Sequence, residues 1–293
     1  MGEQRTFKST RSGGLDFDSL PMRLWQKAKK LGIWDPADID FEEDRRQWES
    51  FDDGEREVLL HLSSMFMGGE EAVTLDLLPL ISVVASEGRL EEEMYLTSFL
   101  WEEAKHVEAF RYFLDEVAQE ESDLTRFHGE NYRAIFEHEL PSALNRLRED
   151  SSPVAQAEAS VTYNLIVEGV LAETGYHAYF EMLQENDVLP GMRTVVGKLK
   201  QDESRHLAYG VHLLSRLVSE HGDEVWEAIE VRMNQLFPLA LGMINEVFEP
   251  YDPVPFDLDE SAFVDFASKQ FQKRYQRVAQ ARTQTLEEIA KTC

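Results

Sequence analysis

The sequence has very little cysteine, which excludes several kinds of protein. Among its 293 residues there is one cysteine, Cys293. A single thiol cannot build an intramolecular disulfide framework, a CxxC zinc site or a cysteine-ligated iron–sulfur cluster. Any metal in this chain is therefore expected to be held by carboxylates and imidazoles.

Basic residues are also scarce, with 29 Lys plus Arg against 56 Asp plus Glu and a formal net charge of −27. Nucleic acids and anionic membranes are recognised by clustered cations, so neither is an expected partner. No stretch reaches the roughly 18 apolar residues of a membrane helix, and the N-terminus lacks a signal-peptide run. We expect a cytoplasmic protein without a stable membrane anchor. The charge fits either a salty cytoplasm or a solvated acidic face.

Strand patterns are sparse, whereas apolar residues commonly recur at the helical period. We expect residues 1–14 to form a flexible N-terminal tail and residues 15–293 to form a single helical domain. Residues 15–53 read as a helix followed by an ordered loop around the core. Further helices are predicted at 53–87, 90–120, 124–148, 153–186, 191–220, 223–248 and 259–290.

Cap and turn residues set the expected helix ends. Asp53 can cap the first long helix, Pro79 should kink it and Gly88 should end it. Pro153 stands at the favoured first position of a later helix, and the next helix follows the break at Pro190. No low-complexity linker divides these helices, so the sequence predicts one all-α domain.

Two Glu-x-x-His motifs lie in apolar helical stretches, at Glu103/His106 and Glu203/His206. Residues three apart lie on one helix face. A carboxylate and an imidazole on an inward face are costly unless something compensates them. A divalent metal does so, because the carboxylates neutralise it and the histidine fills a coordination position.

Two intervening helices each supply one more candidate carboxylate. A di-metal carboxylate bundle needs two Glu-x-x-His helices and one Glu from each of two others. Glu70 and Glu168 lie on apolar faces of the predicted helices 53–87 and 153–186. The predicted metal ligands are therefore Glu70, Glu103, His106, Glu168, Glu203 and His206.

Other acidic and histidine residues give weaker candidates. Glu71 could replace Glu70 by a shift of register, although Glu70 shares the face of Val73 more closely. His177 lies between two glutamates, and Glu137, His138 and Glu139 form another cluster; we interpret both sets as surface or supporting groups, since their surroundings are less apolar.

The proposed ligand set restricts the metal. Four carboxylates and two imidazoles without thiolate suit Fe(II) and Mn(II) and balance the charge of two divalent ions. Such a pair can share its electrons with dioxygen. Zinc could occupy the same ligands but could not supply redox chemistry.

At these residues the sequence resembles a known family. The ligand-binding oxidases related to the ribonucleotide reductase small subunit are similar to this chain at Gly69–Thr74, Glu102–His106, Tyr163–Gly169, Asp202–His206 and Trp34–Phe41. The resemblance covers nearly the whole chain up to its divergent C-terminal region. It implies a ferritin-like four-helix bundle core with additional helices, and a homodimer.

The resemblance also implies a chemistry. It implies a mixed manganese–iron cofactor, a long-chain fatty acid bridging the metals, and a tyrosine–valine ether cross-link formed after dioxygen activation. By the same resemblance, Glu103 would bridge the metals and the cross-link would join Val73 to Tyr163. The manganese site would take Glu70, Glu103 and His106, and the iron site would take Glu168, Glu203 and His206. Occupancy by two irons, and which metal occupies which site, stay open.

The residues themselves support only part of the cross-link. Val73 lies one turn after Glu70 on the same face, where its tertiary Cβ–H can approach the metals. Tyr163 lies five residues before Glu168, about 140° round an ideal helix. A bulge or a contact from a neighbouring helix is therefore needed to bring the tyrosine to the site.

Three other functions remain as alternatives. A ribonucleotide reductase small subunit would use the same ligands to make a radical, but it normally has a tyrosine in a flexible C-terminal tail. Here the last tyrosine, Tyr275, falls in a predicted helix. The others are ferritin-like metal storage and a helical binding protein with structural Glu and His. For the oxidase, we expect a two-electron oxidation or hydroxylation of a hydrophobic hydrocarbon or lipid.

Overall fold

The computed structural model describes residues 7–283, 285 and 288, and this part of the chain contains helices and no strand. Its α-helices are α1 (Leu20–Leu31), α2 (Glu42–Trp48), α3 (Asp53–Asp76), α4 (Leu78–Ser86), α5 (Leu90–Tyr112), α6 (Glu130–Arg133), α7 (Leu140–Arg146), α8 (Pro153–Ser160), α9 (Glu173–Tyr179), α10 (Pro190–His221), α11 (Asp223–Phe248) and α12 (Glu260–Ala279). Four π-helical segments are η2 (Phe113–Ala118), η4 (Ala134–Glu139), η5 (Val161–Ala172) and η6 (Phe180–Gln184). The 3₁₀ turns are η1 (Pro36–Asp38), η3 (Leu124–Phe127), η7 (Pro255–Asp257) and η8 (Gln280–Arg282). No described helix has both the length and the apolar character needed to cross a bilayer.

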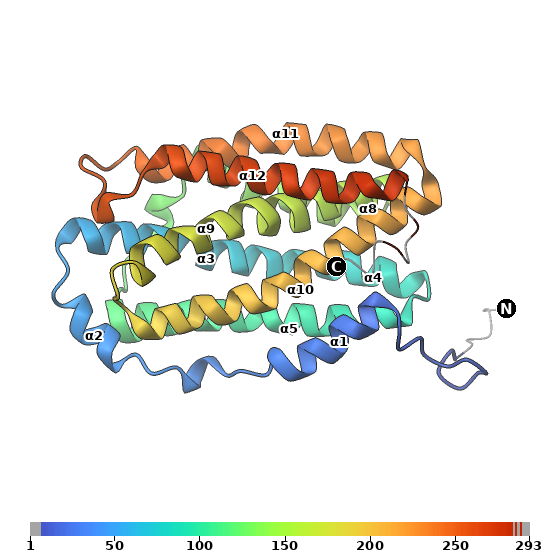
Figure 1. Cartoon of the computed structure of the whole chain (residues 1–293), viewed down its shortest axis with the longest axis horizontal. Coiled ribbons are helices and arrows are strands. Elements are labelled where there is room, and N and C mark those ends of the chain that lie inside the picture. Colours follow the sequence, from blue (N-terminus) through green and yellow to red (C-terminus); the bar gives the residue numbers. More distant parts are fainter. Residues whose placement is uncertain (1–6, 284, 286–287, 289–293) are drawn as a thin grey trace.

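The bundle core consists of α3, α5, α10 and the continuous rod α8–η5–α9. Helix α3 packs on α5 and α10 packs on η5, while α11 and α12 cover η5 from outside. Figure 1 shows α11 and α12 along one long side of the molecule and α1 beside α5 on the opposite side. These outer helices bury the four core rods, so the predicted all-α, ferritin-like bundle with additional helices is confirmed.

The predicted helix 53–87 is capped at its N-terminus and broken near Pro79 as expected, with one correction at the cap. The N-cap is Asp52 rather than Asp53: its carboxylate accepts from the Glu55 amide, and the Glu55 side chain accepts from the Asp52 amide. The helix ends at Asp76 and α4 starts two residues later, because Pro79 has no N–H for the carbonyl of the preceding turn. Gly88, with φ +72°, follows α4 as predicted.

The prediction of one helix over 124–148 is wrong. The 3₁₀ turn η3 comes first, and a helical rod of α6, η4 and α7 then runs without a break from Glu130 to Arg146. The division comes at Gly129, where a new helix starts: the Glu246 carboxylate of α11 accepts from the amides of Asn131 and Tyr132 at 2.8 and 3.4 Å. The predicted helix 259–290 is also too long within the described residues, since α12 ends at Ala279 and η8 follows it.

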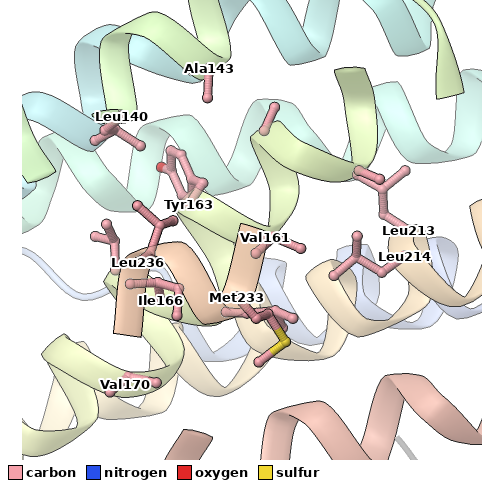
Figure 2. Close-up of a cluster of buried hydrophobic side chains, with 14 of the residues drawn as sticks. Leu140, Ala143, Val161, Tyr163, Ile166, Val170, Leu213, Leu214, Met233 and Leu236 are labelled. Atoms are coloured by element: carbon pink, nitrogen blue, oxygen red, sulfur yellow. The ribbon is translucent and has the colours of Figure 1, made fainter. Parts of the chain in front are cut away.

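The predicted helix 153–186 does exist as one rod, but its middle is π-helical. Pro153 is at its first turn, with Ser152 accepting from the Ala155 amide. In η5 the backbone hydrogen bonds run from residue i to i+5, which makes the turn wider than in an α-helix. Figure 2 shows the side chains of η5, Tyr163 and Ile166 among them, packed between neighbouring helices in the apolar core.

The first 14 residues are described from Phe7 onward. Residues 7–14 form mostly exposed turns and bends, and Lys8 makes an ion pair with the buried Glu91 near the start of α5, with 2.6 Å between Nζ and Oε2. The remainder of the predicted tail, residues 1–6, lies outside the described residues.

Candidate metal centre

Six acidic and histidine side chains from four rods meet inside the bundle. Each of them is at least 95% buried. They form two overlapping groups, in each of which one ligand atom per residue lies within 4.8 Å of all the others. One group is Glu70, Glu103, His106 and Glu203; the other is Glu103, Glu168, Glu203 and His206. Helices α3, α5, η5 and α10 thus bring together all six residues singled out in the sequence.

The two histidines present the same atom to the carboxylates. His106 Nδ1 lies 3.3 Å from a Glu70 oxygen and 3.4 Å from a Glu103 oxygen. His206 Nδ1 lies 3.3 Å from oxygens of both Glu103 and Glu203. Glu103 and Glu203 therefore lie between the histidines, whereas Glu70 and Glu168 belong to one group each.

The outer nitrogen of each histidine is held by a carboxylate from the opposite motif. Asp202, beside Glu203 on α10, places Oδ2 3.3 Å from His106 Nε2 on α5. Glu102, beside Glu103 on α5, places Oε2 3.0 Å from His206 Nε2 on α10. Such carboxylates fix the tautomer and ring orientation of metal-binding histidines. The pairing is crosswise, so each helix orients the histidine of the other.

Both orienting carboxylates are themselves neutralised and anchored. Arg205 donates to Glu102 at 2.6 Å and also bonds Asp202. Trp34 Nε1 donates to Asp202 Oδ2 at 2.8 Å, and Lys105 Nζ lies 3.5 Å from the same oxygen. The positive charges of Arg205 and Lys105 balance the negative charges of Glu102 and Asp202. These four side chains are therefore close to neutral together.

The metal-free cluster carries strongly perturbed pKa values. Burial raises the pKa of Glu70 to about 8, and burial together with the charge of Glu203 raises the pKa of Glu168 well above its usual value. Burial opposes ionisation of Glu103 too, but the neighbouring His206 and His106 hold its pKa below the ordinary range. Burial alone would lower the pKa of both histidines; the carboxylates around them raise it well above 6.5 instead.

Several ligand atoms lack any hydrogen-bond partner among the described residues. They are Glu103 Oε2, Glu168 Oε1, Glu203 Oε2 and His206 Nδ1, all of them buried. Buried polar atoms are normally satisfied, so unsatisfied atoms concentrated at one point indicate a missing partner. A cation pair supplies it: four carboxylates balance two divalent ions, and the oxygen and nitrogen donors suit Mn(II) and Fe(II). The residues present fit a dinuclear centre.

The two residues proposed for the cross-link lie beside this cluster. Tyr163 is fully buried, and its hydroxyl oxygen is 3.2 Å from both Glu103 Oε1 and the Val73 carbonyl oxygen. The π-helical hydrogen bonding of η5 makes this possible, because residues five apart then lie about one turn apart. Tyr163 and Glu168 consequently face the same core.

The weaker sequence candidates lie elsewhere. Glu71 is exposed, whereas Glu70 is buried. His177 is half-buried, stacks on Phe266 and lies 3.7 Å from Glu181, and His138 is exposed on η4. None of these residues belongs to a potential metal-binding group of the described chain.

An apolar cavity opens onto the metal cluster. Inside, it leaves about 100 Å³ for the centres of water-sized molecules. The four carboxylates of the cluster contribute to its lining: Glu70, Glu103, Glu168 and Glu203. The remaining wall is almost entirely apolar, with Leu62, Phe66, Leu171, Met243 and Phe248 among its residues.

The sequence reasoning missed the orienting carboxylates and the cavity wall. The signal for the first was available: each Glu-x-x-His motif is preceded by a second acid, giving the doublets Glu102–Glu103 and Asp202–Glu203. The crosswise pairing depends on how α5 and α10 face each other, which no local spacing shows. The apolar cavity wall comes from α3, η4, η5, α9, η6, α11 and α12 and has no motif.

Comparison with known proteins identifies the family. The family described as "Ribonucleotide reductase, small chain" matches residues 21–250. A solved R2-like ligand-binding oxidase with aerobically reconstituted Mn/Fe cofactor is 34% identical, with a TM-score of 0.89 over 94% of this chain and 98% of that chain. A Tyr-to-Phe variant with the aerobically reconstituted cofactor and a Gly-to-Leu variant with the anaerobically reconstituted one are each 35% identical over the same shares, with TM-scores of 0.87 and 0.88. The crossed motifs, the buried carboxylates and these matches lead to one conclusion: the chain belongs to the ribonucleotide reductase small-chain family, among the R2-like ligand-binding oxidases.

Proposed function

We propose that this protein is a dioxygen-dependent oxidase with a Mn/Fe centre, a bound long-chain fatty acid and a Val73–Tyr163 ether cross-link. The observation that carries the proposal is the convergence of six buried acidic and histidine side chains, four of which line an apolar cavity. A storage site needs no such cavity, and a structural Glu–His cluster would not leave its carboxylate oxygens without partners.

The proposed ligands divide by their position. Glu70 and His106 would hold one ion, Glu168 and His206 would hold the other, and Glu103 and Glu203 lie within reach of both. When bound, the ion pair supplies electrons to dioxygen and so makes a strong oxidant available in a dry site. By accepting from Nε2, Asp202 and Glu102 would keep Nδ1 of each histidine directed into the cluster that would hold the ions.

The contacts of the Tyr163 hydroxyl with Glu103 and with the Val73 backbone support the proposed cross-link. The Tyr163 hydroxyl donates to Glu103 Oε1, so the carboxylate can take its proton when the ether forms. The Val73 Cβ–H bond and the Tyr163 O–H bond break, and one O–C bond forms. The two hydrogens leave as two protons and two electrons, and dioxygen accepts the electrons.

The cavity supports the fatty acid and the class of substrate. A carboxylate headgroup would bind the ions beside the four glutamates. Without the cations, these carboxylates would repel it. The alkyl chain would lie against the apolar wall formed by α3, η5, α9 and α11. The same wall favours a hydrocarbon or lipid as the external substrate of a two-electron oxidation, and it excludes charged substrates by desolvation.

The cross-link gives the sharpest test of the proposed function. Metal-free protein is loaded with Mn(II) and Fe(II) without oxygen, exposed to air, and analysed by peptide mass spectrometry. We expect a joined peptide pair containing Val73 and Tyr163 that is lighter by two hydrogens. Tyr163→Phe should abolish the joined pair, whereas Tyr179→Phe, which alters a tyrosine whose hydroxyl is hydrogen-bonded to Ser63, should retain it. Separate, unmodified peptides after oxygen uptake would contradict the cross-link.

Assembly and location belong to the same proposal. We propose a homodimer in the cytoplasm, supported by membership of the family and by the acidic, cysteine-poor composition. Analytical ultracentrifugation of the metal-loaded protein should give twice the chain mass. A cage-sized particle would instead favour the storage alternative.

A further inference from the structure

A line of aromatic side chains leads from the metal cluster toward one end of the bundle. On α5, Tyr95 and Phe99 precede Glu103 at intervals of four residues and so follow one helix face. On α10, Tyr209 lies three residues after His206. All of these side chains are fully or almost fully buried, and the proposed function uses neither tyrosine.

The rings of this line are in close succession. The Phe99 ring stacks on His206 with 3.6 Å between centroids and 8° between planes. The Tyr95 ring follows at 6.1 Å from Phe99, and the Tyr209 ring at 5.3 Å from Tyr95. Each step is a direct ring contact, and such contacts are short compared with the distances over which electrons tunnel in proteins.

Only the last tyrosine of the line has a base. Removal of an electron from a buried tyrosine also requires removal of its proton, because a buried phenol cation is strongly disfavoured. The Tyr209 hydroxyl donates to Glu92 Oε2 at 3.1 Å. The Tyr95 hydroxyl has no hydrogen-bond partner among the described residues. Tyr95 can therefore act as an intermediate in electron transfer, whereas Tyr209 can lose both an electron and a proton and remain as a neutral radical.

The surroundings of Glu92 tolerate the arrival of a proton. Arg216 and Arg89 lie 3.5 and 3.8 Å from Glu92 Oε1, and both keep other acidic partners, Glu87 and Glu220, if Glu92 becomes neutral. Burial raises the pKa of Glu92 above its usual value despite the two arginines, which makes it a better base than an exposed glutamate. Arg89 and Glu220 are partly exposed, so the cluster also connects Glu92 to solvent.

We propose that Tyr209 is a redox-active tyrosine that donates an electron to the oxidised metal centre through Tyr95 and Phe99 and passes its proton to Glu92. The O–H bond of Tyr209 breaks, the carboxylate of Glu92 becomes a carboxylic acid, one metal ion is reduced by one electron, and a neutral tyrosyl radical remains. The inference rests on the proposed function, since dioxygen must oxidise the centre first. Oxidation of Tyr209 would remove oxidising equivalents from the cavity when no substrate is bound there.

The test is an EPR experiment on the metal-loaded holoprotein. Protein with ring-deuterated tyrosine and unlabelled protein are loaded with Mn(II) and Fe(II), exposed to oxygen without substrate and frozen at intervals. We expect a free-radical signal whose hyperfine structure narrows on deuteration. Tyr209→Phe should abolish the signal. Glu92→Gln, which keeps the shape but loses the base, should abolish it too, and Tyr179→Phe should leave it unchanged.

Oxygen uptake and the Val73–Tyr163 peptide mass are measured in the same samples, to separate the two proposals. A formed cross-link together with no tyrosyl signal, or a signal that survives in Tyr209→Phe, overturns the role of Tyr209 and leaves the oxidase intact. Absence of oxygen uptake overturns both proposals. Loss of the signal in Tyr209→Phe and Glu92→Gln, with normal oxygen uptake and metal content, supports the redox role, because a merely structural role would reduce metal content as well.

Discussion

Asp202 on α10 contacts His106 on α5, so Asp202→Asn is predicted to weaken the binding of the ion held by His106. Asparagine preserves the shape of the side chain and can still accept from Trp34 Nε1. It loses the negative charge 3.3 Å from His106 Nε2, so the imidazole becomes a weaker and less well oriented ligand. Loss of such a carboxylate typically costs 10- to 100-fold in metal affinity, or about 1.4 to 2.8 kcal/mol.

The measurement must distinguish the two ions. Chelator competition gives the affinities, and anomalous scattering from crystals at limiting metal gives the occupancy of each position. In Asp202→Asn the ion next to Glu70 and His106 should be depleted, and the ion next to Glu168 and His206 should be retained. The matched variant Glu102→Gln should deplete the second ion, because Glu102 contacts His206 Nε2 at 3.0 Å. If Asp202→Asn instead depletes the ion next to His206, which lies on the same helix as Asp202, the crosswise account is refuted.

Three further predictions follow from burial and the cavity. Metal loading should raise the melting temperature, because the ions bind the folded cluster and relieve its carboxylate repulsion; scanning calorimetry with and without chelator checks this, and equal melting would contradict it. Ala172→Phe should fill part of the cavity and lower the fatty acid extracted from the protein, measured by mass spectrometry, without changing its metal content. Burial lowers the pKa of His61 to about 4, so the unfolded chain binds more protons than the folded one between pH 6.5 and 4. The free energy of unfolding should therefore fall as the pH falls through this interval, by at most about 3 kcal/mol from this group. In urea titrations His61→Phe should lose less stability over the same interval, and parallel curves for the two proteins would refute the assignment.

Periodicity and spacing were sufficient for the helical bundle and for the convergence of the ligands. Glu103 and His106 are three residues apart, so a helix alone places them on one face, and the same holds for Glu203 and His206. Glu70 required only a choice between two neighbouring glutamates, and the apolar face decided it. The helices and the proximity of these side chains could be predicted because the information is local to each helix, whereas their role as metal ligands stays a prediction.

The features that sequence could not supply depend on contacts between distant segments. Glu246 of α11 caps the helix that begins near Asn131, and this contact divides a segment whose periodicity looked continuous. Asp202 and Glu102 act on histidines about 100 residues away, so their roles appear only when α5 and α10 are placed together. The line through Tyr95 and Tyr209 is invisible in sequence for the same reason.

The π-helical segment Val161–Ala172 makes backbone register itself a component of the centre. If this stretch relaxed to an α-helix, Tyr163 and Glu168 would separate by about 140° around the rod, and one of them would leave the core. Substitutions that favour the narrower helix can therefore disable the protein without altering any group that touches a metal or a substrate. Inactive variants that map to this segment are best examined first for a change in the winding of the chain.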